Sequence, residues 1–227
     1  MSTTTRPAFY ALTPGGWRDY VTLLHPPYTA WHLSYVVLGA ALAPEWRPGI
    51  LGLALAAFFL GMGVAAHALD ELQGRPLQTR IGKKTLVALA AISLAGAAAI
   101  GVVAAVETSL WLLVFVVAGT FLAVAYNLEL FAGRVHGTLW FALGWGALPV
   151  LATYYAAAET IRAEAVAAAV FAVLVSWTQR VLSTPVRAQR RVEGALTPVG
   201  RQFELGLRLL SAAMVALAVA LVLLRVT

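Results

Sequence analysis

The sequence predicts an all-α integral membrane protein with about seven transmembrane helices. Of its 227 residues, 61% are hydrophobic and 11% are charged, and the mean hydropathy is +0.82. Soluble globular domains carry about a quarter charged residues, so that class of protein is excluded. The apolar residues also fall into separate runs, most of them as long as the roughly 17 to 25 residues that a helix needs to cross a bilayer.

The chain divides into two predicted regions. Residues 1–27 are of mixed composition and form an N-terminal segment at the membrane interface, where Trp17 and Tyr20 are typical headgroup-level aromatics. Residues 28–227 form a single transmembrane domain, and its first helix is expected to remain as an anchor because no cleavage-site pattern precedes it. The predicted helices are 28–43, 49–69, 85–106, 109–126, 137–157, 163–182 and 205–225.

Basic residues are distributed unequally between the two ends of these helices. Thirteen of the sixteen Lys and Arg lie in the N-terminal segment, in the 70–84, 127–136 and 180–204 loops, or beside them. By the positive-inside rule this side, with the N-terminus, faces the cytoplasm. The pI of 10.1 therefore reflects topology, and the expected partner is the lipid bilayer, with no nucleic acid.

The stretch 63–82, GVAAHALDELQGRPLQTRIG, contains the end of the second predicted helix and the polar residues that follow it. His67, Asp70 and Glu71 share one helical face, because residues three and four apart are neighbours. Such a face suits a divalent metal, or a carboxylate that orients an imidazole, and a solvated helix end is the alternative. Arg75 and the basic residues after it suit a diphosphate or anionic lipid headgroups.

A second group of polar residues follows the fourth predicted helix, in AYNLELFAGRVHGTLWFALGWGALPVLAT. Gly144, Gly146 and Pro149 then interrupt the next helix, which allows a bend or a close helix approach. Both groups end even-numbered helices and are predicted to share one cytoplasmic cavity. The predicted catalytic residues are His67, Asp70, Glu71, Asn127, Glu129 and His136.

Three segments resemble the UbiA superfamily of membrane prenyltransferases: RPLQTRIGKKTL, AYNLELF and GWGALPVLATYY. The resemblance covers about residues 20–210. It implies a helical bundle, usually of nine transmembrane helices, around a central cavity that opens sideways to the lipid. It also implies an isoprenyl or other lipid substrate, whose diphosphate is bound through magnesium held by two acidic motifs.

The chain departs from both acidic motifs. In register with N-D-x-x-D it has AHALD at residues 66–70, and arginines stand where the second motif is expected. Magnesium prefers oxygen ligands in near-octahedral geometry, so a two-site diphosphate–magnesium complex is hard to build. Arginine can bind phosphate oxygens without a metal. Arg187, Arg190 and Arg191 are therefore expected either to meet an anionic head directly, or only to set the orientation of the protein and touch lipid phosphates.

Three functions remain open. The first is a UbiA-like prenyltransferase in which Asp70 and Glu71 bind one metal, magnesium by the resemblance. Its predicted substrate-binding residues are Arg75, Tyr126, Arg134, Arg187, Arg190 and Arg191. The second is a metal-dependent oxidation, hydrolysis or cyclisation of a lipid, with a nitrogen and oxygen ligand set typical of iron, zinc or manganese. Those ligands would come from His25, His32, His67, Asp70, Glu71, Glu129 and His136. The third is a non-catalytic membrane subunit or lipid-binding protein.

Other chemistries find no support in the sequence. It contains no cysteine, which excludes disulfides, thiolate metal sites and cysteine nucleophiles. A glycine-rich phosphate loop, a nucleophile elbow and a heptad repeat are also missing.

Overall fold

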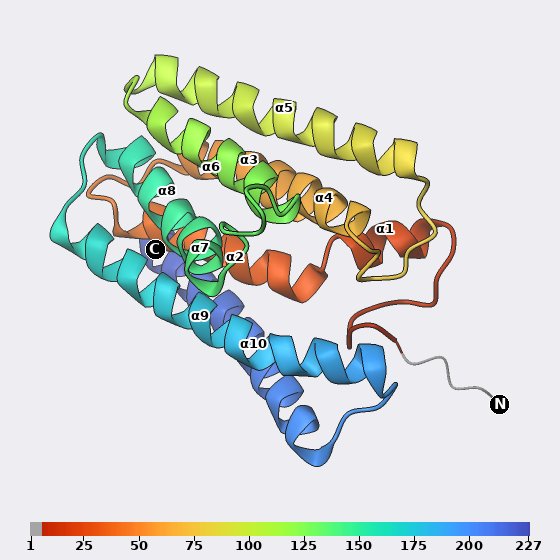
Figure 1. Ribbon diagram of the computed structural model, residues 1–227. Helices are drawn as coiled ribbons and strands as arrows, with labels where there is room; N and C mark the ends of the chain where they lie inside the picture. Colours follow the sequence, from red (N-terminus) through yellow and green to blue (C-terminus); the bar gives the residue numbers. More distant parts are fainter. Residues whose placement is uncertain (1–5) are drawn as a thin grey trace.

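The computed structural model describes residues 6–227, and all regular structure in that range is helical (Figure 1). The elements are α1 (Trp17–Leu23), α2 (Pro26–Leu42), α3 (Pro48–Phe58), η1 (Phe59–Ala66), α4 (His67–Leu72), α5 (Lys83–Glu107), α6 (Leu112–Asn127), α7 (Thr138–Ala142), η2 (Leu143–Ala147), α8 (Leu148–Ala158), α9 (Ala163–Val192) and α10 (Pro198–Val226).

Each predicted helix has a helical counterpart, but five of these are long and apolar enough to cross a membrane. They are Pro48–Leu72 (α3, η1 and α4), α5, Thr138–Ala158 (α7, η2 and α8), α9 and α10. The remaining two, α2 and α6, have 17 and 16 residues. The chain is therefore a multi-pass membrane protein with five candidate spans, and the count of seven spans stays a prediction.

The C-terminal half of α9 departs most from the predicted boundaries. The helix was expected to end at residue 182 but continues to Val192, with Pro185 inside it. Proline removes one backbone donor, and the basic side chains of Arg190 and Arg191 in the last turn complement the negative end of the helix dipole. The predicted 180–204 loop thus shrinks to residues 193–197, and its arginines project from a helix.

Helix α2 occupies the middle of the bundle, packed against α3, α8, α9 and α10 (Figure 1). Trp31 and Tyr35 are fully buried there, and Trp31 Nε1 donates a hydrogen bond to the Tyr35 hydroxyl at 2.8 Å. Gly39 permits the close approach of α8, because a Cβ at this position would lie 2.3 Å from the carbonyl oxygen of Val150. These contacts fix the position of α2 in the centre of the bundle.

The outer surface of the bundle is strongly apolar. Ile92, Val106 and Leu224 are each more than 70% exposed, and many other large apolar side chains of the outer helices are exposed as well. Soluble monomers rarely expose apolar patches of such extent. Contact with lipid acyl chains explains them here.

Two π-helical segments interrupt membrane spans. The predicted interruption at Gly144 and Gly146 is confirmed as η2, and η1 forms a second one before His67. Such segments change the backbone hydrogen-bond pattern and are frequent at functional sites. In this chain, each of them also provides a carbonyl oxygen to a histidine.

Candidate functional site

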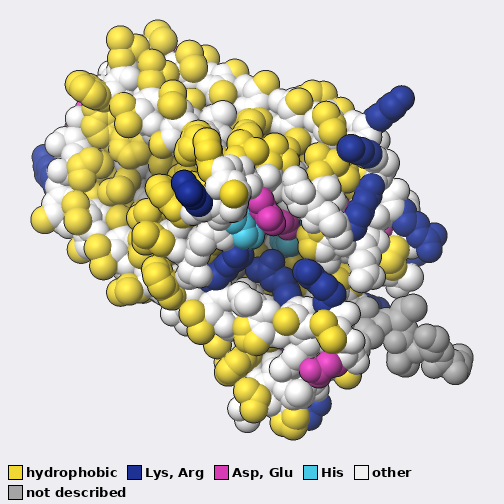
Figure 2. Space-filling model, in the orientation of Figure 1, with side chains coloured by type: hydrophobic (Ala, Val, Ile, Leu, Met, Phe, Trp, Pro, Cys, Tyr) yellow, Lys and Arg dark blue, Asp and Glu magenta, His cyan; other side chains and the backbone are white. Residues whose placement is uncertain are grey.

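Polar side chains converge at the end of the bundle between α4 and the C-terminal half of α9. Figure 2 shows a hollow on this face, with acidic and histidine side chains beside a row of Lys and Arg. The first described residues lie at this end, where Arg190 donates to the carbonyl oxygen of Arg6. Arg225, near the C-terminus, bonds instead to carbonyls of Ala41 and Ala43 at the other end of α2.

Two of the predicted histidines stack on one another inside this region. The rings of His25 and His67 have centroids 4.0 Å apart and an interplanar angle of 16°. His25 has a left-handed backbone (φ 47°), which is uncommon for a residue other than glycine, and it shares a 2.6 Å hydrogen bond with the Tyr10 hydroxyl. Burial, with smaller contributions from His67 and Arg187, lowers the pKa of His25 well below its usual value, so the imidazole is neutral at pH 7.

Three histidines have a fixed tautomer. Nδ1 of His67 donates to Gly63 O at 3.0 Å, Nδ1 of His32 donates to Trp145 O at 3.1 Å, and Nδ1 of His136 donates to Tyr126 O at 2.8 Å. A carbonyl oxygen can only accept, so in each ring Nδ1 carries the proton. Each Nε2 is left as a base or ligand atom.

Asp70 and Arg187 both line a small inner cavity of about 30 Å³. Arg187 and Arg180 contribute positive charge in the surroundings of Asp70. No Lys, Arg or His of residues 6–227 comes within ion-pair distance of the Asp70 carboxylate. Arg187 donates to Ser183 Oγ at 3.2 Å and likewise has no carboxylate partner in that range.

Glu71 points away from this cavity. It is fully buried, and its carboxylate accepts hydrogen bonds from the Leu77 and Thr79 backbone amides and from the Thr79 hydroxyl, at 2.8 to 2.9 Å. Arg75 closes the same loop by donating to the carbonyls of Thr79 and Ile81. The RPLQTRI segment is therefore a loop folded around the Glu71 carboxylate.

Only part of the second predicted group of polar residues, at positions 126–136, faces the same region as the first group. The Tyr126 and His136 rings stack at 4.4 Å, and the Arg180 guanidinium lies over the Tyr126 ring at 5.6 Å. Asn127 is buried but donates to Ala123 O of its own helix. Two members of the group, Glu129 and Arg134, are exposed on the connection between α6 and α7.

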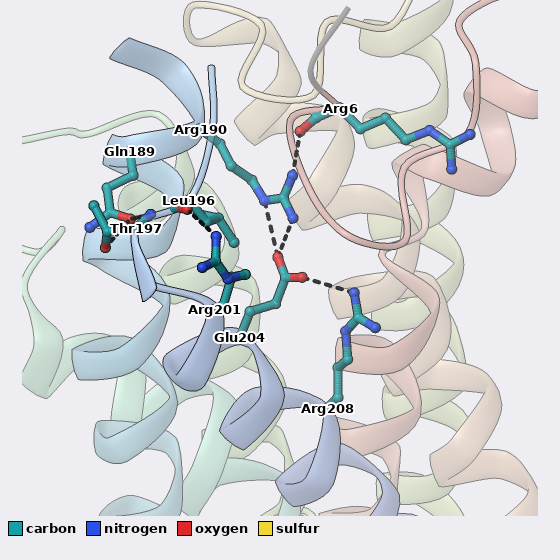
Figure 3. Close-up of polar contacts among 8 residues, drawn as sticks. All are labelled: Arg6, Gln189, Arg190, Leu196, Thr197, Arg201, Glu204 and Arg208. Carbon is teal, nitrogen blue, oxygen red and sulfur yellow. Dashed lines mark hydrogen bonds and ion pairs between the residues drawn. The ribbon is translucent and has the colours of Figure 1, made fainter. Parts of the chain in front are cut away.

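The three predicted anion-binding arginines of α9, at positions 187, 190 and 191, differ in their surroundings. Arg190 is paired with Glu204 of α10, and Glu204 also accepts from Arg208 at 2.8 Å (Figure 3). Arg191 is exposed, whereas Arg187 is partly buried. Within residues 6–227, Arg190 thus has a carboxylate partner, whereas Arg187 and Arg191 have none within ion-pair distance.

An outer hollow of about 330 Å³ lies against the inner cavity. It is lined by the 74–79 loop, Pro7 and three arginines of α9 (187, 190 and 191), and Pro7, Pro76 and Arg187 also line the inner cavity. These three residues thus separate a basic vestibule from the histidine-rich interior. The vestibule has the size and charge to receive a phosphate-bearing group.

Sequence reasoning missed three residues of this region. Tyr10 covers the histidine pair, Glu204 neutralises Arg190, and Asp19 accepts from the Arg80 amide at 3.0 Å and so fixes the 73–82 loop. Glu204 was detectable, because a carboxylate at the start of an apolar helix needs a partner. Tyr10 and Asp19 carried no comparable signal.

Metal binding finds limited support in this geometry. Within residues 6–227, no group of three or more His, Asp or Glu side chains is arranged to hold a metal ion. Glu71 is engaged by the loop, which leaves Asp70 as the only carboxylate of the AHALDE stretch that faces the cavity. The described residues do not fit a magnesium site of the acidic-motif kind.

Comparisons of the chain with known protein families, with characterised proteins and with solved structures gave no match.

Proposed function

We propose that this multi-pass membrane protein is a UbiA-like prenyltransferase that binds an isoprenyl diphosphate, or another lipid with an anionic head, at the basic vestibule. In this proposal the N-terminus and the vestibule face the cytoplasm, and the apolar part of the substrate lies in the bilayer-embedded bundle. The diphosphate is the leaving group, and arginines meet its charge directly. The proposed reaction type rests on the resemblance to UbiA enzymes, and the proposed binding of an anionic head rests on the basic residues of the vestibule.

The single observation behind the proposal is that Arg187 has no carboxylate within ion-pair distance among residues 6–227, although Asp70 lines the same cavity. A partly buried guanidinium without a paired carboxylate is costly, and within the described residues Glu204 pairs with Arg190 and not with Arg187. A phosphate group bound between Arg187 and Arg191 would supply that partner through bidentate hydrogen bonds. The neutral His25 and the fixed Nε2 of His67 would lie on the inner side of the bound group.

No step of this proposal passes through a metal, because the described residues do not fit a magnesium site. A second candidate, a lipid-modifying enzyme with a transition metal, is favoured by the tautomers of His32, His67 and His136, since metal-bound imidazoles usually donate their other N–H to a carbonyl or carboxylate. Metal analysis of the purified protein separates the two. A tightly held iron, zinc or manganese ion favours the second candidate.

Binding of farnesyl diphosphate to the protein in lipid nanodiscs tests the proposal. We expect Arg187→Gln to weaken binding at least about 10-fold, since each hydrogen bond to a charged group contributes roughly 1.5 to 3 kcal/mol. Lys84→Gln is the matched control, because Lys84 is an exposed cation on the same side, and its loss should change binding less than about 2-fold.

Two outcomes would contradict the proposal. One is equal weakening by Arg187→Gln and Lys84→Gln, which would reduce the role of Arg187 to surface charge. The other is the absence of farnesyl diphosphate binding by the unmodified protein. Binding without turnover in the presence of aromatic acceptors would support the lipid-binding protein without catalysis.

A further inference from the structure

Residues 7–12, here called the N-terminal strap, lie across the polar end of the bundle. Residues 7–10 line the inner cavity, and Pro7 also lines the vestibule. The strap contains no helix or strand, and one backbone hydrogen bond joins two of its residues, from the Ala11 amide to the Ala8 carbonyl oxygen at 3.1 Å. Part of the wall between the vestibule and the inner cavity is therefore a segment with little regular structure of its own.

Side-chain contacts of Phe9 and Tyr10 hold the strap against the helices. The Tyr10 hydroxyl shares a 2.6 Å hydrogen bond with Nδ1 of His25, the residue before α2. The Phe9 and Tyr10 rings both meet the Tyr28 ring edge-on, with centroids 6.2 and 5.6 Å away. The Arg208 guanidinium of α10 lies over the Phe9 ring at 4.6 Å. None of these contacts belongs to the backbone of a helix, so the strap can lose them without unfolding a membrane span.

The two ends of the strap are attached differently. At its C-terminal end, the Leu12 amide donates to Oγ1 of Thr22, a buried residue of α1, at 2.9 Å. At its N-terminal end, the neighbouring Arg6 carbonyl accepts from Arg190 at 3.1 Å, and this contact is exposed (Figure 3). Water competes for an exposed hydrogen bond and not for a buried one. The strap is therefore expected to move about residue 12.

The closed strap leaves one polar atom of His25 unsatisfied. His25 is 8% exposed, and its Nε2 is buried with no hydrogen-bond partner among residues 6–227. Its left-handed backbone (φ 47°) is also unfavourable for a residue other than glycine. A buried polar atom without a partner costs free energy that contact with water would recover. The contacts of Phe9 and Tyr10 thus keep the strap closed against a cost at His25.

The closed inner cavity is too small for a ligand. Its volume is about 30 Å³, whereas the vestibule has about 330 Å³. One buried water needs roughly 10 to 15 Å³, so the inner cavity has room for one to three waters and for no phosphate group. A group bound in the vestibule therefore cannot reach His25 while the strap is closed.

We propose that the N-terminal strap is a gate and that Tyr10 is its latch. The structure shows the closed form. When residues 7–10 move away about residue 12, the inner cavity joins the vestibule and His25 becomes accessible from it. A group in the vestibule then gains a path to the histidine pair. The gate does not depend on the identity of that group, and failure of farnesyl diphosphate binding leaves it untouched.

Modification of histidines by diethyl pyrocarbonate tests the gate in the full chain in lipid nanodiscs. The reagent acylates unprotonated imidazole nitrogens, and mass spectrometry of peptides gives a separate rate for each histidine. His25 can react only when the strap opens. His32 is the internal reference, because it is 3% exposed and does not line the inner cavity. His67 stacks on His25 and is therefore not used as a reference.

Two strap variants loosen the gate in different ways. Tyr10→Phe keeps the ring and removes the hydrogen bond to His25, so we expect His25 modification to become about 3- to 10-fold faster, in line with one neutral hydrogen bond. Phe9→Ala removes the contacts with Arg208 and Tyr28 without touching His25, and we expect an increase of at least about 3-fold. The rate at His32 should stay unchanged in both.

Matched controls separate the strap from general effects of the same substitutions. Tyr20→Phe and Phe131→Ala make the same changes at residues that are 45% and 60% exposed and do not line the inner cavity. Neither should change the rate at His25. If Phe9→Ala does not fold, Tyr10→Phe carries the test alone, and protection of His32 reports that the bundle is intact.

Three results would overturn the gate. The first is modification of His25 in the unmodified protein as fast as that of free N-acetylhistidine, since the strap would then not be closed. The second is a rate at His25 that neither strap variant changes, including no modification in any of them. The third is an equal acceleration at His25 and His32, which would show loosening of the whole bundle.

Discussion

Glu71 stabilises the loop that follows α4, a structural role that its position in the sequence did not predict. It was predicted to ligate a metal beside Asp70, but both of its oxygens are taken by donors from residues 77 and 79. Adjacent residues on a helix point in directions about 100° apart, since one turn takes 3.6 residues. Asp70 therefore faces the cavity while Glu71 faces the loop.

Replacing Glu71 by Gln should loosen this loop. One carboxylate oxygen becomes an NH₂ group that cannot accept a hydrogen bond, so we expect a loss of about 2 kcal/mol in unfolding free energy. Hydrogen exchange should show faster exchange at the Leu77 and Thr79 amides. Glu193→Gln is the control, because Glu193 is exposed. Unchanged exchange at both amides would contradict this structural role.

The candidate site was predictable residue by residue only in part. Asp70 and Arg187 do line one cavity with His25, on which His67 stacks, because apolar runs that end in polar groups mark the ends of helices, and these ends meet. Arg187 and Arg190 could not be told apart from sequence. The difference arises from Glu204, a carboxylate on another helix that reaches only one of them.

At the scale of single elements, the π-helical segments connect helix geometry to the site. η1 and η2 provide the carbonyls of Gly63 and Trp145 that fix two imidazoles. The glycines of 143–147 predicted the second interruption. The first was not predicted, because Gly61 and Gly63 in an apolar run are also typical of ordinary helix packing.

Helices α2 and α8 pack closely against each other at Gly39, in the centre of the bundle. Gly39→Ala would place a Cβ 2.3 Å from Val150 O, so we expect about 1 to 3 kcal/mol of destabilisation from overpacking. The control is Gly52→Ala in α3, where a Cβ meets nothing within 4 Å and alanine improves helix propensity by roughly 1 kcal/mol. Thermal unfolding in detergent measures both. A Gly39→Ala protein as stable as Gly52→Ala would refute this packing.

At the scale of the whole molecule, hydropathy predicted the helices because length and apolarity are local properties of the chain. Helix boundaries were less predictable where tertiary contacts decide them. α9 continues through Pro185, and α10 begins at Pro198 with Thr197 as its N-cap. The Thr197 hydroxyl accepts from the Gly200 amide and donates to Gln189 Oε1 of α9, so the turn between the two helices is fixed by both (Figure 3).

The central claim is that arginines of a basic vestibule, without a metal, bind the anionic head of a membrane substrate. Titration of the unmodified protein with farnesyl diphosphate, in EDTA and again in excess magnesium, tests it most directly. We expect dissociation constants that agree within about 2-fold in the two conditions and that rise with salt, because arginine–phosphate attraction is screened. Binding that requires magnesium, or no binding in either condition, would contradict metal-free recognition by the arginines.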